Sequence, residues 1–138
     1  MSDAMRDERL TLLGQSPGDL PAISALLQDA TLRAPDLGFD RRARRLALIV
    51  NRYRWEAGGG SRVRCALRLE TVLAVQRLAW PRDPEAVLNL LALTQEGDQI
   101  RLDFAGGAAL RAQVEVVEVV LEDLAAPWAT ARRPTHEA

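Results

Sequence analysis

The chain has 138 residues, of which 48% are hydrophobic and 27% are charged, and its formal net charge at pH 7 is −1. This is the size and composition of one soluble domain that can bury a core without disulfides or metal. No apolar run approaches the roughly 20 residues that cross a bilayer, and the N-terminus lacks the pattern of a secretory signal, so we expect a single cytoplasmic domain over residues 1–138 with no transmembrane segment.

The N-terminal part of the chain predicts a frayed end followed by one short helix. We expect fraying over about residues 1–10, where both charge signs mix without a pattern. In SPGDLPAISALLQDA, Asp19 is a suitable N-cap and Pro21 lies in the first turn. One apolar stripe, by which the helix would dock, is formed by Leu20, Ile23, Leu26 and Leu27.

From Ala30 onward the pattern changes to strands separated by turn residues. TLRAPDLGF predicts a first strand that Pro35 interrupts, because proline cannot donate to a ladder. After a turn at DRRA, RRLALIVNRYRW predicts a long strand with Leu46, Leu48 and Val50 on one face. Beyond the glycine-rich loop EAGGGS, RVRCALRLE alternates apolar and mostly arginine positions more clearly than any other segment.

The following segments continue the strand pattern. TVLAVQRLAW predicts a strand that ends at PRDPE, and AVLNLLALT predicts a buried strand, with a helix as the alternative. IRLDF and ALRAQV, bounded by the turn segments QEGDQ and FAGGA, predict a hairpin.

The segment VEVVEVVLEDLAA predicts a C-terminal amphipathic helix. Its apolar positions Val114, Val117, Leu121 and Leu124 share one helical face, and Glu115, Glu118 and Glu122 share the opposite face. This prediction follows the periodicity against the weak helix propensity of valine. Pro127 would end the helix and leave a tail over about residues 126–138.

Together these elements predict an α+β fold with a short N-terminal helix, about seven mostly antiparallel strands and a C-terminal capping helix. No alternation of strands and helices indicates a parallel nucleotide-binding sheet. We expect a strongly bent sheet or a partly open barrel whose open end is covered by the C-terminal helix. Pleckstrin-homology-like domains have this element order, and the likeness is one of order only.

The sequence contains few cysteine and histidine residues, two of the types that usually act in catalysis. Cys65 is the only cysteine and is expected to be a buried apolar residue, and the only histidine, His136, lies in the polar tail. The glutamates at positions 115, 118 and 122 could act as acid and base or hold a cation, but a solvent-exposed helix face has the same pattern. We find no cofactor or metal motif, because the glycine segments lack the residues of phosphate loops and dinucleotide sites.

The charges are unevenly distributed along the chain. Nine arginines and one acid lie between Arg41 and Arg68, whereas nine acids and two arginines lie between Asp83 and Asp123. Adjacent strands could gather six of the arginines into a basic patch, namely Arg44, Arg52, Arg54, Arg62, Arg64 and Arg68. The same side chains could instead form ion pairs with the acidic strands and terminal helix, which we favour over nucleic-acid or phospholipid binding.

Three segments, ISALLQDA, RRLALIVNRYRWE and VEVVLEDLAAPWATARRPTH, resemble an uncharacterised proteobacterial family, typical of alphaproteobacteria, that is a domain of unknown function (DUF2948). The likeness covers nearly the whole chain from about Leu10. It implies a single bacterial domain and supplies no catalytic residues. If the tail is a family signature, Trp128, Arg132 and Arg133 belong to a packed or partner-binding segment.

We therefore expect a non-enzymatic interaction or regulatory domain in the cytosol. The expected binding surface is the basic strand region together with Trp128, Arg132 and Arg133, and the expected partner is an acidic protein surface. The first alternative is a binder of the phosphate backbone of RNA or DNA or of an anionic headgroup. The second is an enzyme with a glutamate-based site. Self-association through a strand edge remains open, because no residue pattern decides it.

Overall fold

The computed structural model describes residues 9–57, 60–126 and 128–130. Within them the chain forms one α-helix, α2 (Leu20–Leu27), and three short 3-10 turns, η1 (Pro17–Asp19), η2 (Ala34–Asp36) and η3 (Trp55–Ala57). Eleven strands make up the rest of the regular structure: β1 (Thr11–Gly14), β2 (Thr31–Arg33), β3 (Leu37–Asp40), β4 (Arg45–Tyr53), β5 (Ser61–Leu69), β6 (Val72–Leu78), β7 (Val87–Glu96), β8 (Gln99–Phe104), β9 (Ala109–Val114), β10 (Val119–Asp123) and β11 (Trp128–Ala129).

All strands belong to one sheet with the order β1-β10-β5-β4-β2-β7-β8-β9-β6, and β3 and β11 pair with β4 and β5 off this path. Every pairing is antiparallel. The predicted α+β domain with a mostly antiparallel sheet is confirmed. The prediction of a strongly bent sheet or a partly open barrel is wrong, because the sheet is neither closed nor strongly curled, and β1 and β6 end it without pairing to each other.

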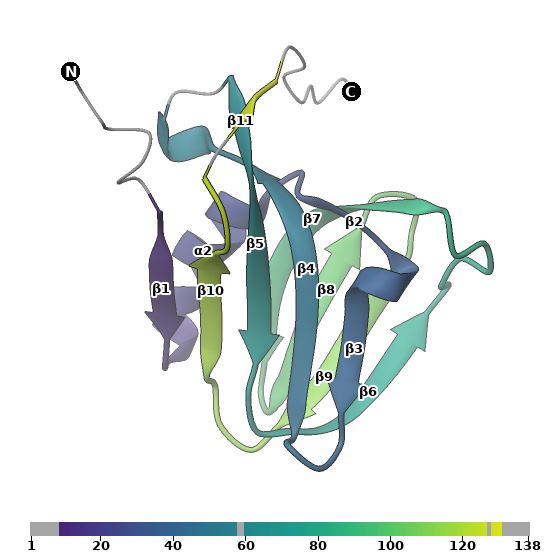
Figure 1. Cartoon of the computed structure of the whole chain (residues 1–138). Helices are drawn as coiled ribbons and strands as arrows, with labels where there is room; N and C mark the ends of the chain where they lie inside the picture. The colour runs from purple at the N-terminus through teal and green to yellow at the C-terminus, as the bar shows by residue number, and fades with distance from the viewer. Residues whose placement is uncertain (1–8, 58–59, 127, 131–138) are drawn as a thin grey trace.

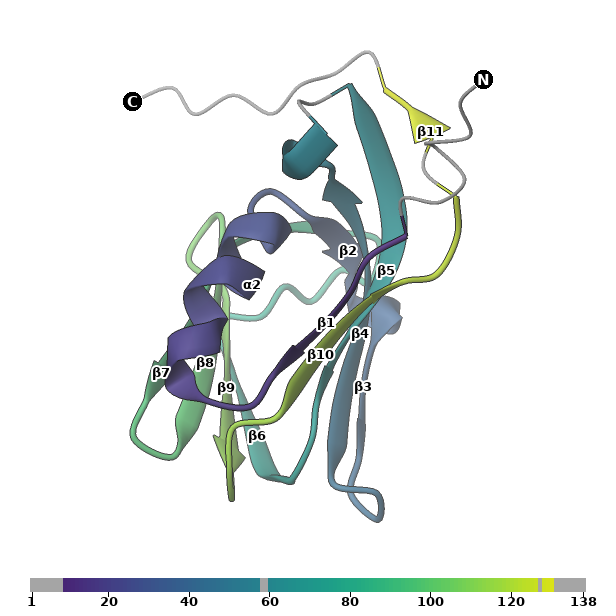
Figure 2. The same cartoon turned by 90° about the vertical axis from the view of Figure 1, so that its left-hand side faces the viewer.

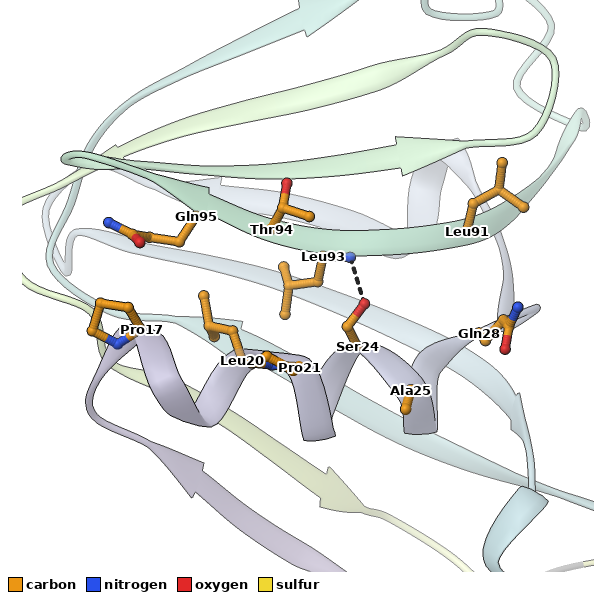
Figure 3. A pocket seen from close by; sticks show the side chains of 10 residues that line it. All are labelled: Pro17, Leu20, Pro21, Ser24, Ala25, Gln28, Leu91, Leu93, Thr94 and Gln95. Carbon is orange, nitrogen blue, oxygen red and sulfur yellow. Dashed lines mark hydrogen bonds between the residues drawn. The ribbon is translucent and has the colours of Figure 1, made fainter.

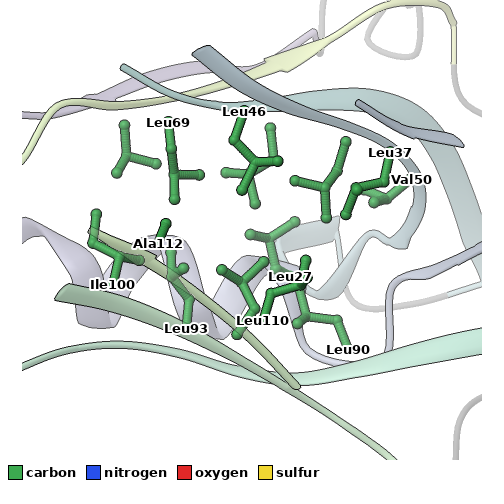
Figure 4. Close-up of a cluster of buried hydrophobic side chains, with 14 of the residues drawn as sticks. Leu27, Leu37, Leu46, Val50, Leu69, Leu90, Leu93, Ile100, Leu110 and Ala112 are labelled. Atoms are coloured by element: carbon green, nitrogen blue, oxygen red, sulfur yellow. The ribbon is translucent and has the colours of Figure 1, made fainter. Parts of the chain in front are cut away.

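The core lies between the two halves of the sheet. In Figure 1, β3, β4, β5 and β10 lie in front of β7, β8 and β9, and Figure 2 shows α2 beside these two halves. Leucine side chains from both halves point into the space between them, with Leu46 and Leu69 on one side and Leu93 and Leu110 on the other (Figure 4). Leu27 of α2 joins this cluster, so the helix docks on the same core. Burial of these side chains supplies most of the driving force for the fold.

The two longest predicted strands have the expected faces. Leu46, Leu48 and Val50 of β4 are buried, and so are Val63, Cys65, Leu67 and Leu69 of β5. The two strands pair over eight residues, from Leu46 opposite Leu69 to Tyr53 opposite Arg62. The period-2 pattern therefore identified both the strands and their inward face.

The shorter predictions also hold. The helix follows Asp19 and buries Leu20, Ile23 and Leu27. Pro35 lies in η2, which separates β2 from β3 where the sequence predicted an interruption. The AVLNLLALT segment is strand β7 and not a helix, and β8 and β9 form the predicted hairpin. Among the described residues, no helix is long and apolar enough to span a membrane.

The predicted C-terminal helix is absent from the described residues, and a strand occupies its place. Residues 115–118 connect β9 to β10, which lies between β1 and β5. In β10, Val119, Leu121 and Asp123 are buried, and Val120 and Glu122 lie on the other face. Valine has a high strand propensity, and two neighbouring strands satisfy the backbone of β10 on both sides, so propensity and ladder bonds outweigh the helical periodicity.

The buried position of Cys65 gives a chemical test of the core. Its side chain is inaccessible to solvent, and burial raises the pKa of the thiol to about 12. We expect no reaction with a thiol-specific disulfide reagent at pH 8 in the folded protein, because the reagent needs an accessible thiolate. Full modification should follow the unfolding transition in denaturant. Rapid modification of the folded protein would contradict this placement.

Candidate binding surfaces

The structure divides the six strand arginines between the interior and two separate surfaces. Arg52 shares the inward face of β4 with Val50 and has a solvent exposure of 0%. Its Nε and Nη2 each donate a hydrogen bond of 3.0 Å to Asp123, and its Nη1 and Nη2 donate hydrogen bonds of 2.9 and 2.8 Å to Glu56. Arg52 is therefore part of a buried ion network and of no exposed patch.

This network joins segments that are far apart in the sequence. Asp123 Oδ2 also accepts a 2.8 Å hydrogen bond from the backbone N–H of Leu10, which fixes the segment that leads into β1. Burial opposes the charged form of Arg52, but hydrogen bonds from the guanidinium to Glu56 and Asp123 raise its pKa above the ordinary value. Burial likewise opposes the Glu56 carboxylate, and the hydrogen bonds from Arg52 still hold the pKa of Glu56 below its usual range.

Arg54 and Arg62 also serve the structure. Arg54 is buried and its Nη1 donates a 3.0 Å hydrogen bond to Ser61 Oγ. The half-buried Arg62 donates from Nη1 to the carbonyl oxygens of Asn51 at 3.0 Å and Asp29 at 3.3 Å, and its guanidinium lies 5.6 Å from the centre of the Tyr53 ring. Burial lowers the pKa of Arg62. Both guanidinium groups therefore use some of their donors within the protein, and these donors cannot bind a partner.

Arg44 lies in the turn that precedes β4 and forms an exposed ion pair with Glu115. The sequence had placed Glu115, Glu118 and Glu122 on one helix face. Because that helix is not formed, Glu115 and Glu118 lie in the connection between β9 and β10, and Glu122 lies on β10. The three carboxylates therefore do not share one face of a single element.

The remaining two, Arg64 and Arg68, lie on the face of β5 that is opposite to its buried residues and points away from the core. We call this surface the β5 outer face and define it by Ala47, Ile49 and Asn51 of β4, Arg64, Ala66 and Arg68 of β5, and Val120 and Glu122 of β10. Arg64 is exposed and Arg68 is half-buried. Neither forms an ion pair with any described residue.

Registers show how the β5 outer face is built. Arg68 lies between Ala47 and Val120, and Ala66 lies between Ile49 and Glu122. The face therefore has a small apolar centre with an arginine at either end of it and one acid, Glu122, on its β10 side. Two residues that are four apart on a strand are about 13 Å apart along it, so Arg64 and Arg68 can contact separate groups of a partner.

The C-terminal segment extends this face. Trp128 of β11 pairs with Arg62 at the end of β5, and 43% of its surface is exposed. Because cross-strand partners share a face, the indole lies on the same side of the sheet as Arg62 and Arg64. Arg132 and Arg133, which the sequence added to this surface, lie outside the described residues.

A second feature, which sequence reasoning did not identify, is a groove of about 570 Å³ between α2 and β7. Figure 3 shows the helix on one side of it and the strand on the other, with a single hydrogen bond of 2.9 Å from the Leu93 N–H to Ser24 Oγ. We call it the α2–β7 groove. Its apolar lining residues are Pro17, Leu20, Pro21, Ala25, Leu91 and Leu93.

The described residues hold no group of three or more histidine, cysteine, aspartate or glutamate side chains that could bind a metal ion. The α2–β7 groove also lacks titratable side chains; its polar lining residues are Ser24, Gln28, Thr94 and Gln95. General acid–base chemistry needs a titratable group within reach of the substrate, so the groove is suited to binding.

Comparison with known proteins identifies one family. The family described as a protein of unknown function (DUF2948) matches residues 10–136, nearly the whole chain. No curated protein and no solved structure matches the chain.

Proposed function

The chain belongs to the DUF2948 family, and we propose that it is a non-enzymatic cytosolic interaction domain whose β5 outer face binds an acidic protein partner. The observation that carries this proposal is the pair Arg64 and Arg68, whose guanidinium groups flank an apolar strip and form no ion pair with a described residue. A guanidinium presents a planar set of donors that matches a carboxylate in two parallel hydrogen bonds.

The composition of the face supports a protein as the partner. Arginine and tryptophan are enriched among the residues that contribute most to protein interfaces, and Trp128 lies beside Arg62 at the end of the same strand. Ile49, Ala66 and Val120 supply an apolar centre that a partner would remove from water. Arg68 Nε is buried and has no hydrogen-bond partner among the described residues.

The same observations give less support to a phosphate-backbone binder. Such a protein needs a track of free basic groups, and its affinity increases with the number of phosphates that they neutralise. Here many arginines are neutralised by neighbouring acids, in the pairs Arg33–Glu85, Arg44–Glu115, Arg45–Glu70, Arg52–Asp123 and Arg101–Asp103. The centre of the β5 outer face is aliphatic, so a base could stack only at its margin, on Trp128.

Replacement of both free arginines tests the proposal. We expect Arg64→Ala and Arg68→Ala each to weaken capture of an acidic partner about tenfold, and the double variant to abolish it, because each loses a charge-assisted contact. The measurement is affinity capture of the tagged protein from its native host at low and moderate salt, with identification of the proteins and nucleic acids that co-purify.

Arg101→Ala is the matched control, because Arg101 is a partly exposed arginine on β8 that is paired with Asp103. It should leave capture unchanged. An acidic partner that the double variant retains would refute the proposed face. Nucleic acid captured alone and released by salt would favour the phosphate-binding alternative.

A further inference from the structure

The α2–β7 groove exists because a helix takes the place of a neighbouring strand. β2 pairs with β7 as far as Asn89, and the backbone N–H of Leu90 donates to Ala30 at 2.8 Å while the Leu90 carbonyl accepts from Asp29 at 2.8 Å. Beyond Leu90, β7 is flanked by α2, which contributes the hydroxyl of Ser24. The backbone N–H and C=O groups of a helix bond within the helix and cannot form a ladder with a strand. The backbone of β7 beyond Leu90 therefore has no strand partner on this edge within the described chain.

The register between β7 and β8 shows which backbone groups of β7 point towards α2 and not towards β8. Glu96 lies opposite Gln99 across a two-residue turn, so Glu96 and Thr94 exchange ladder bonds with β8. Leu93 and Gln95 alternate with them and direct their backbone groups away from β8. The Leu93 N–H reaches Ser24 Oγ, whereas no hydrogen bond from the described part of α2 reaches the Leu93 carbonyl or the backbone of Gln95.

The side chains of the groove determine the charge of its occupant. Pro21 and Ala25 line the groove from α2, Leu91, which is 41% exposed, lines it from β7, and the amides of Gln28 and Gln95 lie at opposite ends (Figure 3). A charged group placed here would lose hydration without gaining a counter-charge. An uncharged, apolar occupant would instead bury the exposed hydrocarbon of both walls.

We propose that the α2–β7 groove binds an uncharged, apolar segment of a partner protein in an extended conformation. The side chains of the segment pack between Pro21, Ala25 and Leu91, and its peptide groups hydrogen-bond to the edge of β7 at Gln95 and to the two amide side chains. Main-chain bonds to a strand edge with pockets for alternate side chains are a recurring mode of peptide recognition. The volume of about 570 Å³ lies within the range of ligand clefts.

Selection from random peptides tests this inference and requires no identified partner. A phage-displayed dodecapeptide library is panned against the folded full-length protein, and the enriched sequences are synthesised with capped ends and titrated by fluorescence anisotropy. We expect a consensus rich in apolar residues and free of charged ones. Ala25→Arg and Thr94→Arg should each weaken binding at least about tenfold, because they place an unpaired charge in the groove.

Ala22→Arg is the matched control, since Ala22 is also exposed on α2 but does not line the groove. Arginine is a good helix former, so both helix variants should fold, and their unfolding midpoints verify this. Equal binding by the Ala22→Arg and Ala25→Arg variants, or the absence of an enriched sequence, would overturn the inference. An acidic consensus that Arg64→Ala abolishes and Ala25→Arg does not would also overturn it, while supporting the proposed function of the β5 outer face.

Discussion

Asp123→Asn is expected to lower the free energy of unfolding by about 3 kcal/mol, because it removes the charge that faces a fully buried guanidinium. The Asp123 side chain is 1% exposed and the Arg52 side chain 0%, so water cannot replace the lost carboxylate. Glu56 still binds Arg52, which keeps the loss at the lower end of the range for a broken buried pair. Urea denaturation followed by tryptophan fluorescence measures the change.

Two comparisons separate burial of the charge from loss of the ion pair. Asp103→Asn breaks a pair whose side chains are more than a third exposed, and it should cost less than about 1 kcal/mol. The double variant Arg52→Met with Asp123→Leu removes both charges of the pair. It should be more stable than Asp123→Asn alone, which leaves the buried guanidinium of Arg52 without the Asp123 carboxylate. Equal losses for Asp123→Asn and Asp103→Asn would contradict the buried network.

The sequence identified strands where two independent signals agreed. In β4 and β5, alternation of apolar residues coincides with β-branched or bulky side chains and with turn residues at the ends, and both strands formed with the expected inward face. The helix α2 formed with its first-turn proline and its apolar stripe, although the Asp19 side chain makes no cap hydrogen bond to it and accepts from the backbone of Gln15 and Ser16 instead. Agreement between propensity and periodicity made these predictions reliable.

Where residue propensity and hydrophobic periodicity disagreed, the structure follows the propensity. The VEVVEVVLEDLAA segment fits a helical stripe, but Val119, Leu121 and Asp123 also alternate with period 2, and valine favours the strand. The edge of β5 was available to receive it, which no local pattern could reveal. Because this segment forms a strand, the described part of the chain has no C-terminal helix that could cover the end of a barrel.

For the candidate surface, the face on which each arginine lies matters more than the number of charges in a segment. Arg52 has the same parity as Leu46, Leu48 and Val50, so the alternation that identified the core already placed it inside. Arg64 and Arg68 have the opposite parity from the buried residues of β5 and lie on its other face, where Arg64 is exposed and Arg68 is half-buried. The α2–β7 groove joins residues that are about seventy positions apart, and only the tertiary structure brings them together.

The position of Leu110 allows a direct test of the face-to-face packing of the two sheet halves. We expect Leu110→Ala to lower the free energy of unfolding by about 3 kcal/mol, because the side chain is fully buried between the halves and its removal leaves a cavity. Urea denaturation with an unchanged m-value measures the loss.

Leu73→Ala is the control, since Leu73 lies on the edge strand β6 with 46% of its surface exposed. It should change stability by less than about 1 kcal/mol. The two leucines differ in burial and not in chemistry, so the difference between the variants reports the tight packing of the inner faces. Similar small losses for both would mean that the halves do not meet at Leu110, and the core would then have to lie elsewhere in the molecule.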